Sequence, residues 1–108
     1  MKATNLKNLP GVKAVCLPQP EKDITGVYCC DLLSLVMGKA PAGCAWVTVM
    51  GNVNAVAVAS LAEIGAVIIA GGAAVDPVAV KKAQENGVNL FCCEMPIFET
   101  ARTVDRAL

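Results

Sequence analysis

The stretch from Ala45 to Gly72 constrains the fold of this chain more than any other. It reads AWVTVM, then GNVNAVAVASLAEIG, then AVIIAGG: an apolar run, a Gly-Asn turn with an alanine-rich segment, and a second apolar run. Two apolar runs joined by a segment of helical length are typical of parallel strands with a crossover helix. We therefore predict that a strand–helix–strand unit forms the centre of an open parallel sheet.

The middle of this unit is predicted to be a helix over residues 53–64, although VNAVAVA also alternates as a strand would. Its alanine content, Asn52 as N-cap and Gly65 as terminator favour the helix. One apolar stripe comprises Val53, Val56, Ala57, Ser60, Leu61 and Ile64, and the opposite, equally apolar face comprises Ala55, Val58, Ala59 and Ala62. The second face predicts a further covering, either within the monomer or from another subunit.

Further strands and helices are predicted on either side of this unit. Apolar segments predict strands at residues 12–17, 24–29 and 88–92, with Lys13 on the exposed side of an edge strand. Helices are predicted at residues 4–9 with Thr4 as cap, 31–40 with Asp31 as cap, 77–86 with Asp76 as cap and Gly87 as stop, and from Pro96 onward. The expected fold is one α/β domain over residues 1–108, a small, mostly parallel sheet with βαβ crossovers and helices packed on it.

Charge and composition exclude several classes of function. Nine basic and nine acidic residues cancel, which leaves no electrostatic footprint for nucleic acid or for a membrane surface. Glu63 and several glycines interrupt the apolar run at residues 53–75, so we expect no membrane span. The N-terminal segment has no apolar signal core, and the six cysteines are then expected to be reduced thiols in the cytoplasm.

In open parallel sheets, ligands bind at the carboxyl ends of the strands, where loops lead into helices. We expect any ligand at the loops after the two central strands, and the candidate residues are Gly51, Asn52, Asn54, Gly71 and Gly72. The glycines allow close backbone approach, and the asparagines supply uncharged donors and acceptors. Neither loop contains Lys or Arg, so a neutral or singly anionic group fits better than a triphosphate. The alternative is that these are ordinary turn residues.

Two cysteine pairs, Cys29-Cys30 and Cys92-Cys93, each close a predicted strand. On neighbouring strands, four sulfurs could gather and bind a soft metal or an iron–sulfur cluster. Adjacent strand residues point to opposite faces, however, which favours packing roles for these thiols. The chain has no histidine, no C-x-x-C pair and no nucleophile elbow. We therefore expect no catalytic residue, no metal site and no cofactor.

Three segments resemble the DRTGG domain family in order and spacing: GVYCCDLLSLVM (26–37), GNVNAVAVASLAEIGAVIIAGG (51–72) and FCCEMPIFETA (91–101). The resemblance covers the chain from about Gly11 onward. Residues 68–72 stand at the position of the motif that names the family, and only Gly71 and Gly72 match that motif. The DRTGG domain occurs alone, in CBS-containing inorganic pyrophosphatases and in some phosphotransacetylases, and it is similar to the N-terminal domain of HPr kinase/phosphorylase.

This resemblance implies a non-catalytic regulatory or ligand-sensing α/β module, often dimeric, that acts on a partner protein. The alternative is a small-molecule binding domain, for an adenine nucleotide for example, that uses the Gly51/Gly71 loop edge. A cysteine-based metal or redox site is a third hypothesis. The second apolar faces of the helices at 31–40 and 53–64 predict a homodimer that forms through these helices.

Overall fold

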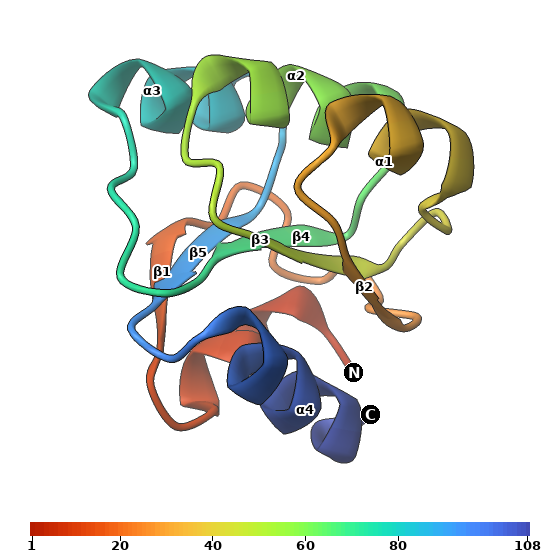
Figure 1. The fold of residues 1–108 in the computed structure, drawn as a ribbon, viewed down its shortest axis with the longest axis vertical. Helices are drawn as coiled ribbons and strands as arrows, with labels where there is room; N and C mark the ends of the chain where they lie inside the picture. Colours follow the sequence, from red (N-terminus) through yellow and green to blue (C-terminus); the bar gives the residue numbers. More distant parts are fainter.

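The structure, a computed structural model, describes all of residues 1–108. Its elements are η1 (Ala3–Asn8), β1 (Val12–Cys16), β2 (Val27–Cys29), α1 (Leu33–Lys39), β3 (Ala45–Thr48), α2 (Val53–Leu61), β4 (Ala66–Ile69), α3 (Pro77–Glu85), β5 (Leu90–Cys93) and α4 (Ile97–Ala107). These elements form three layers, with the sheet between two layers of helices (Figure 1). None of the helices has the length and apolar content needed to cross a membrane.

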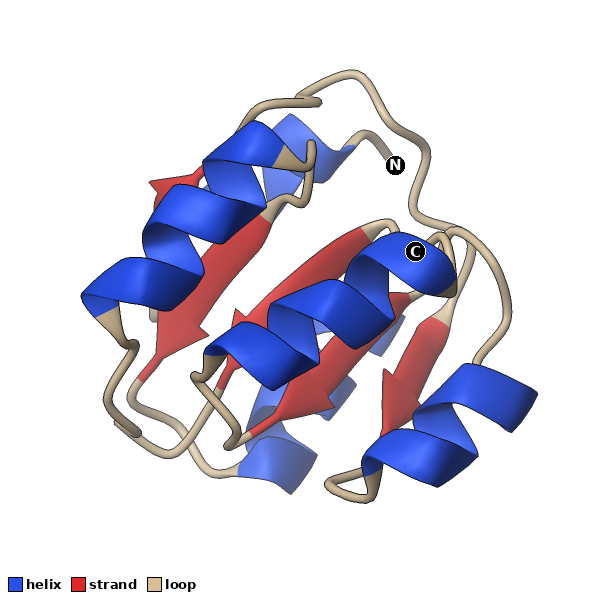
Figure 2. Ribbon diagram, turned by 90° about the horizontal axis from the view of Figure 1, so that it is seen from above, coloured by secondary structure: helices blue, strands red, loops and turns tan.

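The sheet has five strands in the order β1-β5-β4-β3-β2. Strands β2 to β5 are parallel, and β1 pairs antiparallel with β5 at one edge. Helices α1, α2 and α3 cover one face, while α4 and η1 lie on the other (Figures 1 and 2). The predicted fold class, a small and mostly parallel α/β sheet with crossover helices, is confirmed.

The sheet separates two hydrophobic clusters. One lies under α1, α2 and α3 and contains Trp46, Val67 and Leu90. The other lies against η1 and α4 and contains Leu6, Ile68 and Phe91. Every residue of β3 and β4 is buried, since both faces of these strands are covered. Continuous apolar runs such as AWVT and AVII therefore suit the central strands of this sheet.

Three of the predicted helix boundaries are confirmed, and all three depend on local geometry. The Asn52 side chain accepts a hydrogen bond of 2.9 Å from the Ala55 amide and so caps α2. Asp76 stands at the N-cap position of α3, although its side chain makes no capping hydrogen bond, and Pro77 follows at the first helical position. After the helix, Gly87 turns the chain into the left-handed region at φ 70°.

Three other predicted boundary roles are wrong. The N-cap residues of η1 and α1 are Lys2 and Leu32, so neither Thr4 nor Asp31 caps a helix. Helix α2 ends at Leu61, and the residue that turns the chain into the left-handed region is Glu63, at φ 56°. Gly65 is required for packing instead, because a Cβ atom there would overlap the carbonyl of Gly43.

The predicted inward face of α2 is right in part. Val56 and Ile64 of the predicted stripe are buried, but Val53 and Leu61 are exposed, and Ala55 and Ala59 of the opposite face are buried instead. Helix α2 lies between α1 and α3, so its flanks are covered within the monomer (Figure 1). The large apolar side chains left on its outer surface, Val53 and Leu61, therefore belong to the stripe that the sequence pattern assigned to the core.

The two glycines at positions 65 and 38 give a matched test of this packing. We expect Gly65→Ala to destabilise the fold by about 1–3 kcal/mol, because its methyl group collides with fixed backbone. Gly38 lies within α1 with open space where a Cβ atom would be, so Gly38→Ala should stabilise by about 0.5–1 kcal/mol. Urea denaturation measures both changes, and equal effects of the two substitutions would contradict this packing.

Candidate ligand site

The carboxyl ends of β2 to β5 lie at one end of the sheet, and each leads into a loop before the next helix. The first two of these loops are tied together by Asp31. Its carboxylate accepts hydrogen bonds from the Thr48 hydroxyl at 2.7 Å and from the Val49 amide at 3.1 Å. Asp31 therefore joins the end of β2 to the end of β3 and does not cap α1.

The loop between β4 and α3 is held on one side by the loop after β5. The Gly71 amide donates to the Met95 carbonyl at 2.7 Å, and the Gly72 amide donates to the Cys93 carbonyl at 3.0 Å. Both glycines have a φ of 67°, a left-handed conformation that favours glycine. These two amides are engaged within the fold, so neither is free to donate to a ligand.

On its other side, the same loop contacts the loop between β3 and α2. The Asp76 amide donates to the Gly51 carbonyl at 2.8 Å. A Cβ atom at position 51 would overlap the Ala74 carbonyl, so only glycine allows the two backbones to approach this closely. The β4–α3 loop is thus fixed at both ends of its path.

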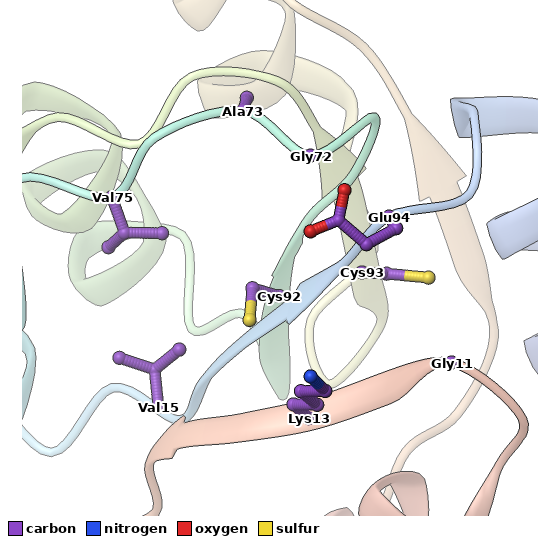
Figure 3. A pocket seen from close by; sticks show the side chains of 9 residues that line it. All are labelled: Gly11, Lys13, Val15, Gly72, Ala73, Val75, Cys92, Cys93 and Glu94. Atoms are coloured by element: carbon purple, nitrogen blue, oxygen red, sulfur yellow. The ribbon is translucent and has the colours of Figure 1, made fainter.

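A cavity of about 290 Å³ lies between this loop and strands β1 and β5 (Figure 3). Val15 and Val75 form its apolar side, and Lys13 rises from β1 toward Cys92. The Glu94 carboxylate lies beside Gly72 at the other side. Lys13 and Glu94 form no ion pair with each other, so the cavity presents one free cation and one free anion.

The five predicted site residues are divided among three environments. Gly72 lines the cavity, and Gly71 precedes it in the same loop. Gly51 and Asn52 border a closed gap among α2, α3 and the sheet that leaves no room for a water molecule. Asn54 is exposed in the first turn of α2. Of the five predicted residues, only Gly72 therefore lines the cavity, and the residues opposite it were not among those predicted.

Lys13 and Glu94 are the charged residues that the sequence argument left out of the site. Lys13 reaches the cavity because β1 pairs antiparallel with β5, which sets it opposite Cys92. The alternation of residues 12–17 did predict that Lys13 faces outward, but not which strand lies beside it. Glu94 follows β5 directly, and its place after a parallel strand was the one available signal.

The two cysteine pairs do not converge. Strands β3 and β4 separate β2 from β5, so the arrangement that a four-sulfur site requires is absent. Cys92 lines the cavity, whereas the Cys93 sulfur points away from it and accepts from the Thr100 hydroxyl at 3.4 Å (Figure 3). No three Cys, Asp or Glu side chains are placed to hold one ion. All six cysteines are free thiols.

Comparison with known proteins identifies a relative in fold. The crystal structure of the CBS and DRTGG domains of the regulatory region of Clostridium perfringens pyrophosphatase, complexed with the activator diadenosine tetraphosphate, matches with a TM-score of 0.77. The match covers 99% of this chain and 47% of that chain at 13% sequence identity. The fold is DRTGG-like. No model of a protein family matches the sequence, and neither does any curated protein.

The buried thiol of Cys44 makes the stability of this DRTGG-like fold depend on pH. Burial raises the pKa of the Cys44 thiol to about 11, while an unfolded thiol titrates near 8.5. Stability from neutral Cys44 is therefore complete below about pH 8.5 and is lost as the pH rises toward 11. Urea denaturation between pH 8 and pH 11 should show a decline in the free energy of unfolding that is shallower in Cys44→Ala. Identical slopes for the two proteins would contradict this assignment.

Proposed function

We propose that this chain is a non-catalytic regulatory module that senses a small molecule and acts on a partner protein in the cytoplasm. The observation that carries the proposal is the cavity formed by the β4–α3 loop, with Lys13 and Glu94 as its free charges. The match to a regulatory region that binds a nucleotide activator supports the sensing role. Six free thiols suit a reducing compartment.

The proposed site combines this cavity with the loop edge predicted from the sequence, Gly51–Asn54 and Gly71–Gly72. Gly72 belongs to both parts. A volume of about 290 Å³ is near the lower end of small-molecule pockets, so the cavity fits one part of a ligand whose remainder lies along the edge. Asn54 is exposed there and offers an amide for that remainder.

The charges of the cavity favour a ligand with one anionic group and one hydrogen-bond donor. The Lys13 ammonium attracts the anion, and the Glu94 carboxylate accepts from the donor. Val15 and Val75 offer an apolar surface for a flat ring between them. An adenine nucleotide with a single phosphate has all three features, and a triphosphate would leave most of its charge without a cationic partner.

We also propose that the module acts as a homodimer. Several large apolar side chains remain exposed, including Leu32, Leu35 and Phe98. A chain of 108 residues that exposes this many apolar side chains is stabilised when a second subunit covers them.

A nuclear magnetic resonance titration with AMP and ATP tests the sensing role. We expect AMP to shift the amide signals of Lys13, Glu94 and Gly72–Val75, and ATP to bind more weakly. Lys13→Met should weaken AMP binding roughly 10- to 100-fold, because it removes a hydrogen bond to a charged group. Lys81→Met, on the exposed surface of α3, is the matched control and should bind AMP as the unaltered chain does.

Three results would contradict this proposal. Tighter binding of ATP than of AMP would contradict the charge argument. Shifts confined to the opposite end of the sheet, or an equal loss of affinity in both lysine variants, would contradict the site.

A further inference from the structure

The two edges of the sheet differ in how they are protected against pairing with another strand. At one edge, β1 carries the exposed Lys13 and an irregular register between Ala14 and Cys16. Charges and bulges of this kind discourage edge-to-edge association. At the other edge, β2 reads Val27, Tyr28 and Cys29, with neither a charge nor a proline nor a bulge.

Strand β2 also presents backbone groups without partners. The Gly26 carbonyl accepts from the Ala45 amide, and the Cys30 amide donates to the Val47 carbonyl, so these groups face β3. In a parallel ladder, alternate residues bond to the same neighbour. The amides and carbonyls of Val27 and Cys29 therefore point away from β3, toward the open edge.

A groove of about 490 Å³ runs between this edge and α4, and Val27, Cys29, Phe98 and Arg102 are among its lining residues. The Phe98 ring is 67% exposed, with the Arg102 guanidinium 5.3 Å from its centroid. The ion pairs of the chain are Lys2–Asp23 and Lys82–Glu85. Arg102 and its groove neighbour Asp105 consequently have no ionic partner.

We infer that this edge binds a second copy of the chain, with β2 paired antiparallel to β2 of the partner subunit and Tyr28 at the two-fold axis. The inference rests on the proposed dimer and names its interface. Val27 would face Cys29 of the partner subunit, and their outward amides and carbonyls would bond reciprocally. The two sheets would become one continuous sheet, and an isologous contact of this kind closes on itself.

The outer stripe of α4 is self-complementary under the same two-fold axis. Phe98, Arg102, Asp105 and Leu108 lie on one face, at spacings of four, three and three residues. Antiparallel pairing of the two α4 helices would place Arg102 opposite Asp105 of the partner subunit, and Phe98 beside Leu108 of the partner subunit. Arg102 thereby gains the ionic partner that it lacks within one chain.

The spacing of the layers agrees with this pairing. Helix α4 contacts both β2 and β3, so its axis lies about one strand spacing, roughly 5 Å, from the proposed two-fold axis. The two α4 axes would then be about 10 Å apart, which is the ordinary distance for packed helices. The outer surface of α2 exposes Leu61 but offers neither unpaired backbone nor a complementary charge pair.

A charge exchange on α4 tests this interface. Sedimentation velocity over a concentration series should show the unaltered chain at twice 11.1 kDa. Arg102→Glu and Asp105→Arg should each weaken dimerisation roughly tenfold, because like charges then face each other twice across the axis. The double variant R102E/D105R should restore it. Both side chains are exposed, so the substitutions leave the fold of the chain intact.

A disulfide gives a second, geometric readout. Val27→Cys should form a covalent dimer with Cys29 of the partner subunit on mild oxidation, since paired strand residues of this kind stand about 5.5 Å apart. The same variant combined with Cys29→Ser should stay non-covalent. Crosslinking that is indifferent to Cys29 would overturn the strand pairing.

The remaining outcomes distinguish an error in the proposed interface from an error in the proposed dimer. A monomeric unaltered chain would overturn both. The β2 interface would be overturned, but not the proposed dimer, if the single charge variants dimerised as tightly as the unaltered chain. The same would follow if only Leu61→Glu dissociated the dimer. Failure of the R102E/D105R double variant to recover would also overturn the α4 pairing.

Discussion

The close approach of two backbones at Gly51 determines the shape of the candidate site. Its Cα atom lies against the Ala74 carbonyl, and its own carbonyl accepts from the Asp76 amide. This contact holds the far end of the β4–α3 loop, while Gly71 and Gly72 hold the near end against the loop after β5. The cavity exists because the loop between these two anchors stands away from β1 and β5.

The loops at this end of the sheet form a row of contacts from the edge strand β2 to β5, the strand next to the other edge. Asp31 joins the end of β2 to the end of β3, and Gly51 joins the β3–α2 loop to the β4–α3 loop. Gly72 then bonds to Cys93 at the end of β5. The proposed dimer edge and the cavity thus lie at opposite ends of one row of hydrogen-bonded loops.

Features that depend on near neighbours in the sequence could be predicted. Asn52, Pro77 and Gly87 act within a few residues of their own positions, and so their roles at the helix ends follow from local geometry. Features that depend on distant partners could not be predicted from the sequence. Asp31 could have capped a helix, but Thr48 lies 17 residues away and takes its carboxylate. The apolar residues of α2 surround the whole helix, so only its place between α1 and α3 decides which side is buried.

Amide hydrogen exchange in Gly51→Ala tests the central claim, that the contact at Gly51 closes the loop over the cavity. The account predicts faster exchange at Asp76 and at Gly71–Val75, since the added methyl group pushes the two loops apart, with little change in the central strands β3 and β4. Unchanged exchange throughout the β4–α3 loop would contradict it, as would a loss of protection spread evenly over the whole sheet.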